Sequence, residues 1–291
     1  MPEVDPASPV PPSDKATQSG STDEGFSPKF TIVTVTYNAE HTLERTLKSI
    51  SGQSYPNIEH IIVDGLSSDA TLTLIQEYVE DNSVCTHPHE ISLIREPDKG
   101  LYDAMNKAID NAGGDYLVFL NSGDKFHSPD TIEAVVRDAA PIYGHNNDPN
   151  RWPAVLYGET DLVDNDGHFL RHRRLQSPEK LHWHKFIDGM LVCHQSFYVR
   201  TDLARKHHYD LHYRFSADYD WAIRIMKDAD AGALALHNTR LILTDYLSEG
   251  MTTRNHRRSL LERLRIMCRH YGCLAALRQH LWFVLRLSIL R

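Results

Sequence analysis

Between residues 30 and 140 the sequence alternates between short β-branched runs and segments with helical periodicity. The runs at 31–36, 58–63, 91–94 and 116–120 have the composition of strands. Each is followed by a helical pattern, at residues 39–51, 71–80 and 100–111, and finally after Ser128-Pro129-Asp130. Strands that alternate with helices predict βαβ units, in which helices flank a mostly parallel sheet. We therefore predict an α/β fold, with a further strand at residues 155–158.

The first residues differ in composition from the rest. Residues 1–28 are rich in Pro, Ser, Thr and Asp and have almost no large apolar side chains. Such a segment cannot bury enough surface to fold, so we expect a disordered leader, with order beginning near Phe30. Residues 29–250 should then form a single domain.

The net charge of −8 is unevenly distributed. Residues 251–291 contain nine arginines and one acidic residue, so this tail carries +8 and the other 250 residues carry −16. We expect an amphipathic helix at 259–270 and an apolar helical segment at 281–290. A basic amphipathic tail suits an anionic partner, such as the headgroups of a membrane. The alternatives are that the basic charges only form a solvated helix face, and that the segment at 281–290 packs on the protein core.

Cysteine and hydropathy patterns favour a cytoplasmic protein. None of the four cysteines forms a CxxC pair, which argues against a disulfide framework or a zinc ribbon. No apolar run approaches the ~20 residues of a membrane span. The acidic, proline-rich start does not have the pattern of a signal peptide. Any membrane contact should therefore be peripheral, through the tail, at the inner face of the cell membrane.

Polar residues follow each predicted strand at the point where it ends. In open parallel sheets, ligands bind at the carboxyl ends of the strands, so these residues should converge on one edge. Small residues, carboxylates and one lysine at such an edge suit a nucleotide and a divalent cation. The segments are Thr36-Tyr37-Asn38, Asp64-Gly65, Glu96-Pro97-Asp98-Lys99-Gly100 and Asn121-Ser122-Gly123-Asp124.

Two common nucleotide-binding motifs are missing from the sequence. There is no P-loop, and the first strand–helix turn, "TYNAE", contains no glycine. A Walker-type ATPase and a Rossmann dehydrogenase are therefore disfavoured.

Four segments, in order, resemble the nucleotide-sugar half of family 2 glycosyltransferases. They are "TIVTVTYNAEHTLERTLKSISGQSY", "EHIIVDGLSSDAT", "REPDKGLYDAMNKAI" and "GDYLVFLNSGDKF". The resemblance is close over residues 30–130 and looser as far as residue 250. It implies a GT-A fold, a Rossmann-like mostly parallel mixed sheet flanked by helices, here with a C-terminal helical extension. Residues 29–140 would bind the nucleotide sugar, and residues 141–250 the acceptor.

The resemblance assigns donor-binding roles to the strand-end residues. Asp64 would accept a hydrogen bond from the base, while Lys99 and Gly100 would approach the phosphates. Asp69 would support the turn after Asp64, although a plain helix N-cap is the alternative. The implied donor-binding residues are Thr36, Tyr37, Asn38, Asp64, Lys99, Gly100, Asn121 and Ser122.

The segment "LNSGD" stands where the family has a DxD-type metal motif, and it resembles the variant in enzymes that build bacterial exopolysaccharides and surface polysaccharides. It keeps a single carboxylate, Asp124. Mg²⁺ works with one or two carboxylates because it retains waters and takes the substrate's phosphates as ligands. We therefore expect Asp124 to be the main ligand of Mg²⁺ or Mn²⁺. A plain turn without metal is the alternative.

A candidate catalytic base lies in "FSADYDW", which precedes a helical pattern at 222–227. This stretch resembles the family's "ED" motif, in which the aspartate deprotonates the acceptor hydroxyl. Asp218 matches that aspartate, whereas Ala217 replaces the glutamate. Asp220 is the second candidate for the base. The alternative is that both acids only stabilise a helix start.

The remaining candidate residues concern the acceptor. His194, in "CHQSFYV", matches a segment that the family places between donor and acceptor, and Trp221 could stack on a sugar or pack in the core. Eight of the 18 histidines fall between residues 168 and 212, where a zinc site is the alternative to a polar acceptor groove. In the tail, arginines could grip a diphosphate or an anionic lipid. These are Arg254, Arg257 and Arg258.

The combined prediction is a metal-dependent, inverting glycosyltransferase of the hexosyltransferase type. It would move a sugar from a nucleotide-diphospho-sugar to a hydroxyl of a glycan or lipid-linked acceptor in polysaccharide biosynthesis, with no role for nucleic acid. One alternative is a degenerate module that only binds carbohydrate or a partner. The other is a nucleotidyltransferase, which would need a basic glycine-rich loop that "TYNAEHT" lacks.

Overall fold

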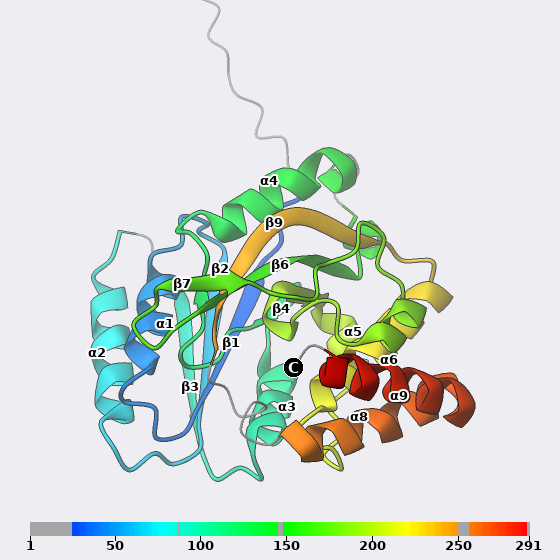
Figure 1. Cartoon of the computed structure of the whole chain (residues 1–291). Coiled ribbons are helices and arrows are strands. Elements are labelled where there is room, and N and C mark those ends of the chain that lie inside the picture. The colour runs from blue at the N-terminus through cyan, green and yellow to red at the C-terminus, as the bar shows by residue number, and fades with distance from the viewer. Residues whose placement is uncertain (1–24, 87, 145–147, 249–255, 290–291) are drawn as a thin grey trace, which may run out of the picture.

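The computed structural model describes residues 25–86, 88–144, 148–248 and 256–289, without the side chains of 256, 257 and 282–289 (Figure 1). Nine strands of this part of the chain form one sheet, in the order β3-β2-β1-β4-β8-β6-β9-β5, with β7 paired to β6. The strands are β1 Phe30–Thr36, β2 Ile58–Asp64, β3 Glu90–Arg95, β4 Tyr116–Phe119, β5 Lys125–Phe126, β6 Val155–Val163, β7 Phe169–His172, β8 Phe197–Arg200 and β9 Leu236–Leu247.

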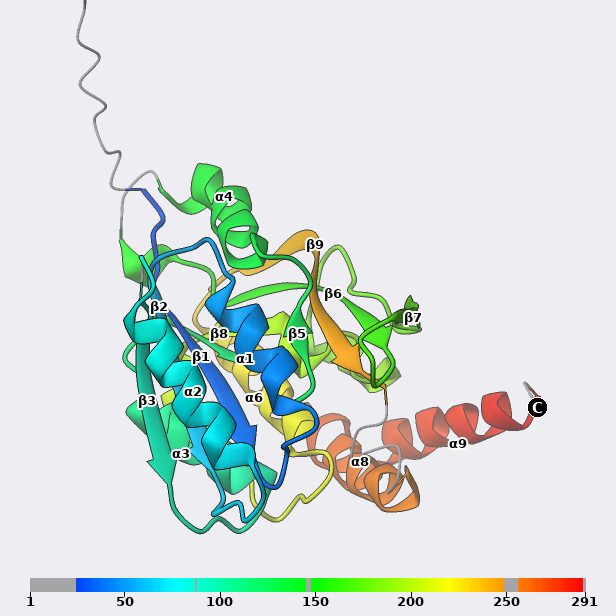
Figure 2. The same cartoon turned by 90° about the vertical axis from the view of Figure 1, so that its left-hand side faces the viewer.

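Helices cover both faces of the sheet (Figures 1 and 2). Apolar side chains of α1, α2 and α4 pack on one face, and those of α3, α5 and α6 pack on the other. The helices are α1 Leu43–Ser51, α2 Thr71–Ser83, α3 Leu101–Asn111, α4 Thr131–Tyr143, α5 Thr201–Lys206, α6 Ala217–Ala231, α8 His256–Tyr271 and α9 Cys273–Ile289. Short 3₁₀ helices include η3 Trp183–Asp188 and η4 His194–Ser196.

The first half of the sheet is parallel, and the second half is mixed. β1 pairs in parallel with β2 and β4, and β2 with β3. Every residue of β1 and β2 is buried, which explains why these strands appear in the sequence as continuous β-branched runs. β8 runs antiparallel between β4 and β6, and β6 pairs in parallel with β9. The predicted α/β fold with a mixed sheet is confirmed.

Two predicted element boundaries were wrong. The first helix begins at Leu43 instead of residue 39, because Asn38 has a left-handed φ of +48° and the chain turns before the helix starts. The predicted strand at 155–158 continues to Val163, because it pairs along its length with β9.

Order begins earlier than the predicted Phe30. Phe26 is 2% exposed, and its ring lies 5.0 Å from the ring of Trp152 and 6.3 Å from that of Tyr116. The buried ring of Phe26, near the end of the expected leader, packs residues 25–28 against the core. Residues 1–24 of the leader expected over residues 1–28 lie outside the described residues.

The C-terminal helices pack on the domain. Ile266 and Met267 of α8 and Ala276 of α9 are buried in the same apolar core as α6. The face of α8 that carries these residues is therefore a packing face. The side chains of residues 282–289, for which core packing was the alternative, lie outside the described parts of the chain. None of the helices in the described part of the chain is both long and apolar enough to cross a membrane.

The Phe26 contact predicts a loss of stability on truncation. Phe26→Ala removes a buried ring beside Trp152, so we expect the free energy of unfolding to fall by about 3 kcal/mol. Urea unfolding followed by tryptophan fluorescence measures this. Val84→Ala, at an 84% exposed position, is the control and should change stability by less than about 0.5 kcal/mol. Equal stability of F26A and wild type would contradict the packing of residues 25–28.

Candidate active site

The carboxyl ends of β1 and β2 meet at one edge of the sheet, because the two strands are parallel. Thr36 and Asp64 are partners in their register, and Thr36 Oγ1 is buried without a hydrogen-bond partner among the described residues. The loops that follow are tied together, since Asn38 N–H donates to Ser67 Oγ (2.9 Å) and Ser68 N–H donates to Asn38 Oδ1 (2.9 Å). The first two predicted donor segments therefore form one rim.

Asp64 and Tyr37 occupy different positions on this rim. Asp64 is fully buried and accepts hydrogen bonds from Ser67 N–H (3.1 Å) and Ser67 Oγ (2.5 Å), while Arg95 Nε lies 3.5 Å away. Tyr37 is 66% exposed, so its ring is accessible to a ligand. Asp64 anchors the rim, and Tyr37 forms part of its accessible surface.

The loop between β3 and α3 lies against the same edge. Gly100 has a left-handed φ of +117°, and its N–H donates to Asp98 Oδ1 (2.7 Å). A side chain at Gly65 would collide with the carboxylate of Asp98, so the two loops are in contact. Lys99 is exposed beside them. The structure thus brings Lys99 and Gly100 to the edge where the sequence placed them.

Residues 120–124, hereafter the lip, form a tight turn after β4. Gly123 has a φ of +99°, and Asp124 N–H donates to the carbonyl of Asn121 (2.9 Å). Thr46 of α1 holds the turn, because its Oγ1 accepts from Gly123 N–H (2.9 Å) and donates to the carbonyl of Asp124 (2.7 Å). Ser122 Oγ bonds a threonine hydroxyl just before α1 (3.0 Å). Hydrogen bonds therefore hold the lip against the start of α1.

The side chain of Asp124 is buried beneath the lip. One carboxylate oxygen accepts from Leu247 N–H (3.0 Å), and the other accepts from Gln195 Nε2 (2.8 Å). Burial raises the pKa of Asp124 to about 7, although these two hydrogen bonds oppose the shift. Asp124 thus ties the lip to β9 and to η4, and the sequence did not indicate either partner.

A chain of polar contacts runs from the lip to the start of α6. Asn121 Nδ2 donates to His194 Nε2 (3.2 Å), and His194 Nδ1 lies 3.6 Å from Asp218 Oδ2. The hydroxyl of Tyr102, in the first turn of α3, donates to Asp218 Oδ1 (3.1 Å). Three residues that the sequence suggested separately, Asn121, His194 and Asp218, are therefore neighbours.

The ring of His194 presents one of its nitrogen atoms to the carboxylate of Asp218. Burial lowers the pKa of His194, and the nearby Asp218 carboxylate only partly offsets this effect, so the ring is neutral at pH 7. Because Nε2 accepts from Asn121, the ring proton resides on Nδ1, which faces Asp218. Asp218 also lies in the first turn of α6, where the helix dipole stabilises a negative charge.

Ala217 replaces the glutamate of the resembled motif, and its surroundings explain the substitution. Its side chain is fully buried in the apolar core beneath α6. A glutamate at this position would place an ionised group in that core at high energetic cost. The site therefore has one carboxylate at the start of α6 that faces the lip.

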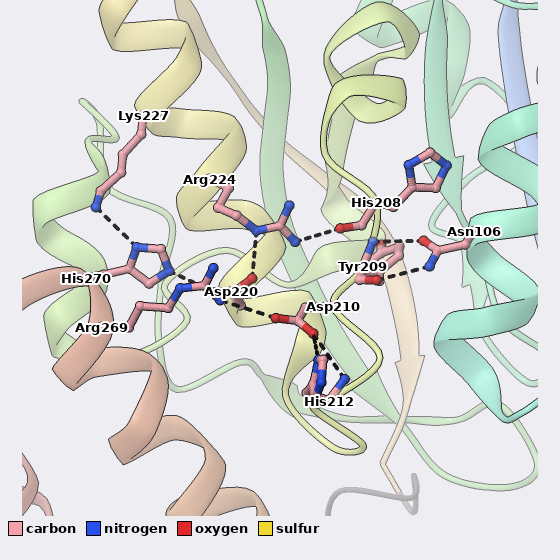
Figure 3. A network of polar contacts seen from close by, with 10 residues as sticks. All are labelled: Asn106, His208, Tyr209, Asp210, His212, Asp220, Arg224, Lys227, Arg269 and His270. Carbon is pink, nitrogen blue, oxygen red and sulfur yellow. Dashed lines mark hydrogen bonds and ion pairs between the residues drawn. The ribbon is translucent and has the colours of Figure 1, made fainter.

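The side chain of Asp220 is surrounded by polar groups of the protein and is not accessible to a substrate (Figure 3). Its carboxylate is fully buried and accepts from Arg224 Nε (2.7 Å) and His270 Nε2 (2.8 Å). Burial alone would raise the pKa of Asp220, but the hydrogen bonds and positive charge of these partners lower it. Its burial contradicts Asp220 both as the second candidate for the base and as a contact to the acceptor substrate, since both carboxylate oxygens accept hydrogen bonds inside the protein.

Trp221 is also wrong as a predicted sugar contact. It is fully buried, and its ring lies 4.8 Å from that of Tyr209 and 5.8 Å from that of Phe119. The residue faces the sheet from α6, which leaves no surface for a ligand.

The C-terminal helix α8 supports the segment that leads to Asp218. Glu262 accepts hydrogen bonds from Arg214 N–H (2.9 Å) and Phe215 N–H (2.8 Å), and Ser259 Oγ lies 3.0 Å from Ser216 Oγ. Sequence reasoning missed Glu262. The available signal was that Glu262 is the only acidic residue in a basic tail.

The structure does not test the predicted contacts of the tail arginines. Arg254 and the side chain of Arg257 are not among the described parts of the chain, and Arg258 is exposed at the start of α8. Their predicted phosphate or lipid contacts stay predictions.

The lip offers two oxygen ligands for a divalent cation. Asn121 Oδ1 is buried and has no hydrogen-bond partner among the described residues, so it is an unused acceptor. Asp124 supplies a carboxylate in the same turn, but both of its oxygens already accept hydrogen bonds. This donor set fits a hard cation that draws most of its ligands from water and phosphate.

Sequence comparison identifies related proteins. Residues 31–200 match the model of glycosyl transferase family 2. An uncharacterized glycosyltransferase of Mycobacterium tuberculosis is 33% identical over 200 residues, which cover 68% of each chain. A PGL/p-HBAD biosynthesis glycosyltransferase of Mycobacterium bovis is 28% identical over 220 residues, covering 75% of this chain and 77% of that protein.

Solved structures share the fold at low sequence identity. TarS 1–349 of S. aureus in complex with UDP-GlcNAc has a TM-score of 0.59 and 16% identity, covering 82% of this chain and 65% of that one. The mannosyltransferase PcManGT of Pyrobaculum calidifontis, in complex with GDP-Man and Mn²⁺, has a TM-score of 0.54 and 18% identity, covering 87% and 74%. The predicted GT-A fold is confirmed by these likenesses.

The buried carboxyl of Asp124 predicts a pH-dependent stability. Because its pKa rises from 3.8 to about 7 on folding, the folded protein retains a proton that the unfolded chain has lost between these values. Its stabilising contribution is full below the unfolded pKa and declines as pH rises toward 7, by at most ~1.4 kcal/mol per pH unit. Asp124→Asn removes this dependence.

We therefore expect the free energy of unfolding of D124N, relative to wild type, to increase between pH 5 and pH 7. Urea titrations in EDTA at a series of pH values measure the difference. A difference that stays constant across this range would show that Asp124 is already ionised in the folded protein.

Proposed function

Because the chain belongs to family 2 of the glycosyltransferases, we propose that it moves a sugar from a nucleotide-diphospho-sugar to a hydroxyl of a glycan or lipid-linked acceptor. The family membership supports this activity, as does the 28% identical PGL/p-HBAD biosynthesis glycosyltransferase. The observation that carries the proposal is the contact chain Asn121–His194–Asp218, which connects the end of β4 to one oriented carboxylate. We propose residues 29–140 as the donor half and residues 141–250 as the acceptor half.

The proposed donor is a sugar attached to a nucleoside diphosphate. Structures with the same fold hold UDP-GlcNAc or GDP-Man, which supports this class of donor. The exposed ring of Tyr37 is suited to stack on the base, and Asp64 and Asn38 shape the loop beneath it. Lys99, exposed at the same edge, is placed to attract the phosphates.

We propose that Mg²⁺ or Mn²⁺ accompanies the donor. Asn121 Oδ1 and Asp124 would hold the cation, which would neutralise the charge that develops on the departing diphosphate. The Oδ1 atom of Asn121, which accepts no hydrogen bond among the described residues, supports this assignment. A structural neighbour in complex with Mn²⁺ also supports it.

Asp218 is the proposed general base. Its carboxylate would take the proton of the acceptor hydroxyl as the oxygen attacks the sugar. Tyr102 and the Nδ1–H side of His194 hold the carboxylate in place before the acceptor substrate arrives. Because Asp218 is the carboxylate at the start of α6 that faces the lip, a single displacement with inversion is the proposed course.

A degenerate binding module is the second candidate. It is favoured by the two internal hydrogen bonds of Asp124, which occupy the only carboxylate of the lip. In that case the rim would hold a nucleotide or sugar without metal and without turnover.

The substitution Asp218→Asn separates catalysis from binding. We expect the rate of sugar transfer to fall by roughly 10²–10⁴-fold, because a positioned base contributes about this much. Nucleotide affinity should stay unchanged, since Asp218 faces the acceptor. Transfer is measured as release of UDP or GDP from UDP-GlcNAc or GDP-Man, with bacterial lipid extract as the acceptor source.

Asp230→Asn is the matched control, since it changes a 57% exposed carboxylate on the same helix. Isothermal titration of UDP, GDP and dTDP, in Mn²⁺ and in EDTA, measures binding by wild type, D218N and D124A. Binding that requires metal and Asp124 supports the transferase. Metal-independent binding without turnover supports the binding module, and binding of no nucleotide would overturn both.

We also propose a peripheral membrane contact through the tail. Leu274, Leu277 and Leu281 are 88%, 54% and 60% exposed on α9, at a spacing that places them on one helical face. Arg278 is exposed on the same helix. Apolar and basic side chains together are typical of helices that lie at the surface of anionic membranes.

Leu277→Glu tests this contact. We expect wild type to sediment with vesicles that contain phosphatidylglycerol and L277E to lose most of this binding. Arg278→Ala should weaken binding about fivefold, because one basic residue near an anionic surface contributes ~1 kcal/mol. Leu211→Glu, at an exposed site outside the tail, is the control. Equal sedimentation of wild type and L277E would refute the contact.

A further inference from the structure

A second group of metal-binding side chain types lies where β5, β6, β7 and β9 run side by side (Figure 2). His127 follows β5, Asp161 lies on β6, His172 ends β7, and Asp245 lies on β9. The proposed transferase chemistry uses none of these residues. Two imidazoles and two carboxylates form a donor set that is common at zinc sites.

The sheet register sets the two carboxylates next to each other. Asp161 and Asp245 are direct partners in the parallel pairing of β6 with β9, and they are 4% and 6% exposed. Asp161 is also the register partner of His172 in the pairing of β6 with β7. The strands therefore position three of the four side chains at adjacent places on the sheet.

The ligand atoms already lie close together. One ligand atom from each of His127, Asp161 and Asp245 lies within 4.8 Å of the others. His127 Nδ1 is 2.8 Å from Asp245 Oδ1, and His172 Nδ1 is 2.7 Å from Asp161 Oδ1. A tetrahedral zinc site with bonds of about 2.0–2.1 Å separates its ligand atoms by roughly 3.3 Å. Small side-chain movements would therefore form the site.

The charges of this cluster favour a cation. Two buried carboxylates side by side repel each other unless positive charge lies between or beside them. Lys125 Nζ, 2.8 Å from Asp245 Oδ2, compensates one of them. Asp161 pairs with His172, a weaker base than lysine or arginine. A divalent ion between the two carboxylates would compensate the pair.

We propose that His127, Asp161, His172 and Asp245 bind one Zn²⁺ ion, or a similar divalent transition metal. Imidazole ligands favour zinc over magnesium, which prefers oxygen ligands alone. The side chains of His127 and His172 are 40% and 69% exposed, so an ion can enter from solvent.

This site is separate from the proposed donor cation. Residues alternate between the two faces of β9, so Tyr246, whose pKa is raised by burial and by the nearby charges of Asp124 and Asp218, lies on the opposite face from Asp245. Asp245, the preceding residue, instead contacts Lys125 and His127. A metal here would link the segment that follows the lip to β6 and β9, and would thereby stabilise the end of the sheet that supports the lip.

Titration with Co²⁺ tests the proposal, because tetrahedral Co²⁺ absorbs strongly in the visible range and surface-bound octahedral Co²⁺ does not. The protein is stripped with chelator and titrated without nucleotide. We expect one equivalent with a tetrahedral spectrum, displacement by Zn²⁺, and a higher melting temperature when metal is bound. His127→Gln and Asp161→Asn should each weaken Co²⁺ binding at least tenfold.

His168→Gln is the matched control, because His168 belongs to an exposed group with Asp164 and Asp166 that also has metal-ligand spacing. H168Q should retain the wild-type Co²⁺ spectrum. His172→Gln, which changes a mostly exposed ring, serves if D161N fails to fold. An octahedral spectrum only, or equal tetrahedral binding by wild type, H127Q and H172Q, would overturn the site.

The test is independent of the proposed transferase function. D218N should bind Co²⁺ in the absence of nucleotide as wild type does. H127Q should retain the nucleotide- and Mn²⁺-dependent binding expected of the donor site. A result that overturns the zinc site would therefore leave the proposed donor site unaffected. A result that overturns the donor site would likewise leave the zinc site unaffected.

Discussion

The buried carboxylate of Asp124 is the contact on which the arrangement of the candidate site depends. It joins the lip to Gln195, 71 residues away in sequence, and to the backbone of Leu247, 123 residues away. These contacts bring η4 and the end of β9 against the end of β4. His194, the neighbour of Gln195, is thereby held beside Asn121. Burying an ionisable group is costly, and the two donors offset part of that cost.

The Asp218 end of the Asn121–His194–Asp218 contact chain depends on helix α8. Asp218 starts α6, and the segment before it is held by Glu262 and Ser259 of α8. Asp220, two residues later, binds His270 of the same helix (Figure 3). The tail therefore has two surfaces with different roles. One completes the support of the proposed base, and the other exposes leucines of α9 to solvent.

The local sequence pattern predicted strands and helices correctly where the burial of a residue follows from strand or helix periodicity alone. The β-branched runs of β1 and β2 predicted central strands because both faces of those strands are covered. The same reasoning could not separate Asp218 from Asp220, since both are acids at a helix start. Their difference arises from what packs there, with Arg224 and His270 around Asp220 and Tyr102 beside Asp218.

By itself, the sequence determined the α/β class, the approximate elements, the edge of the sheet that carries polar residues, and the family. These features depend on short-range patterns of apolar and polar residues, which are written in consecutive positions. Only the tertiary structure decided that Trp221 is a core residue, that Asp124 binds Gln195, and that Asp161 faces Asp245 across β6 and β9. The reason is that contacts between distant segments depend on strand order and register, which no local pattern specifies.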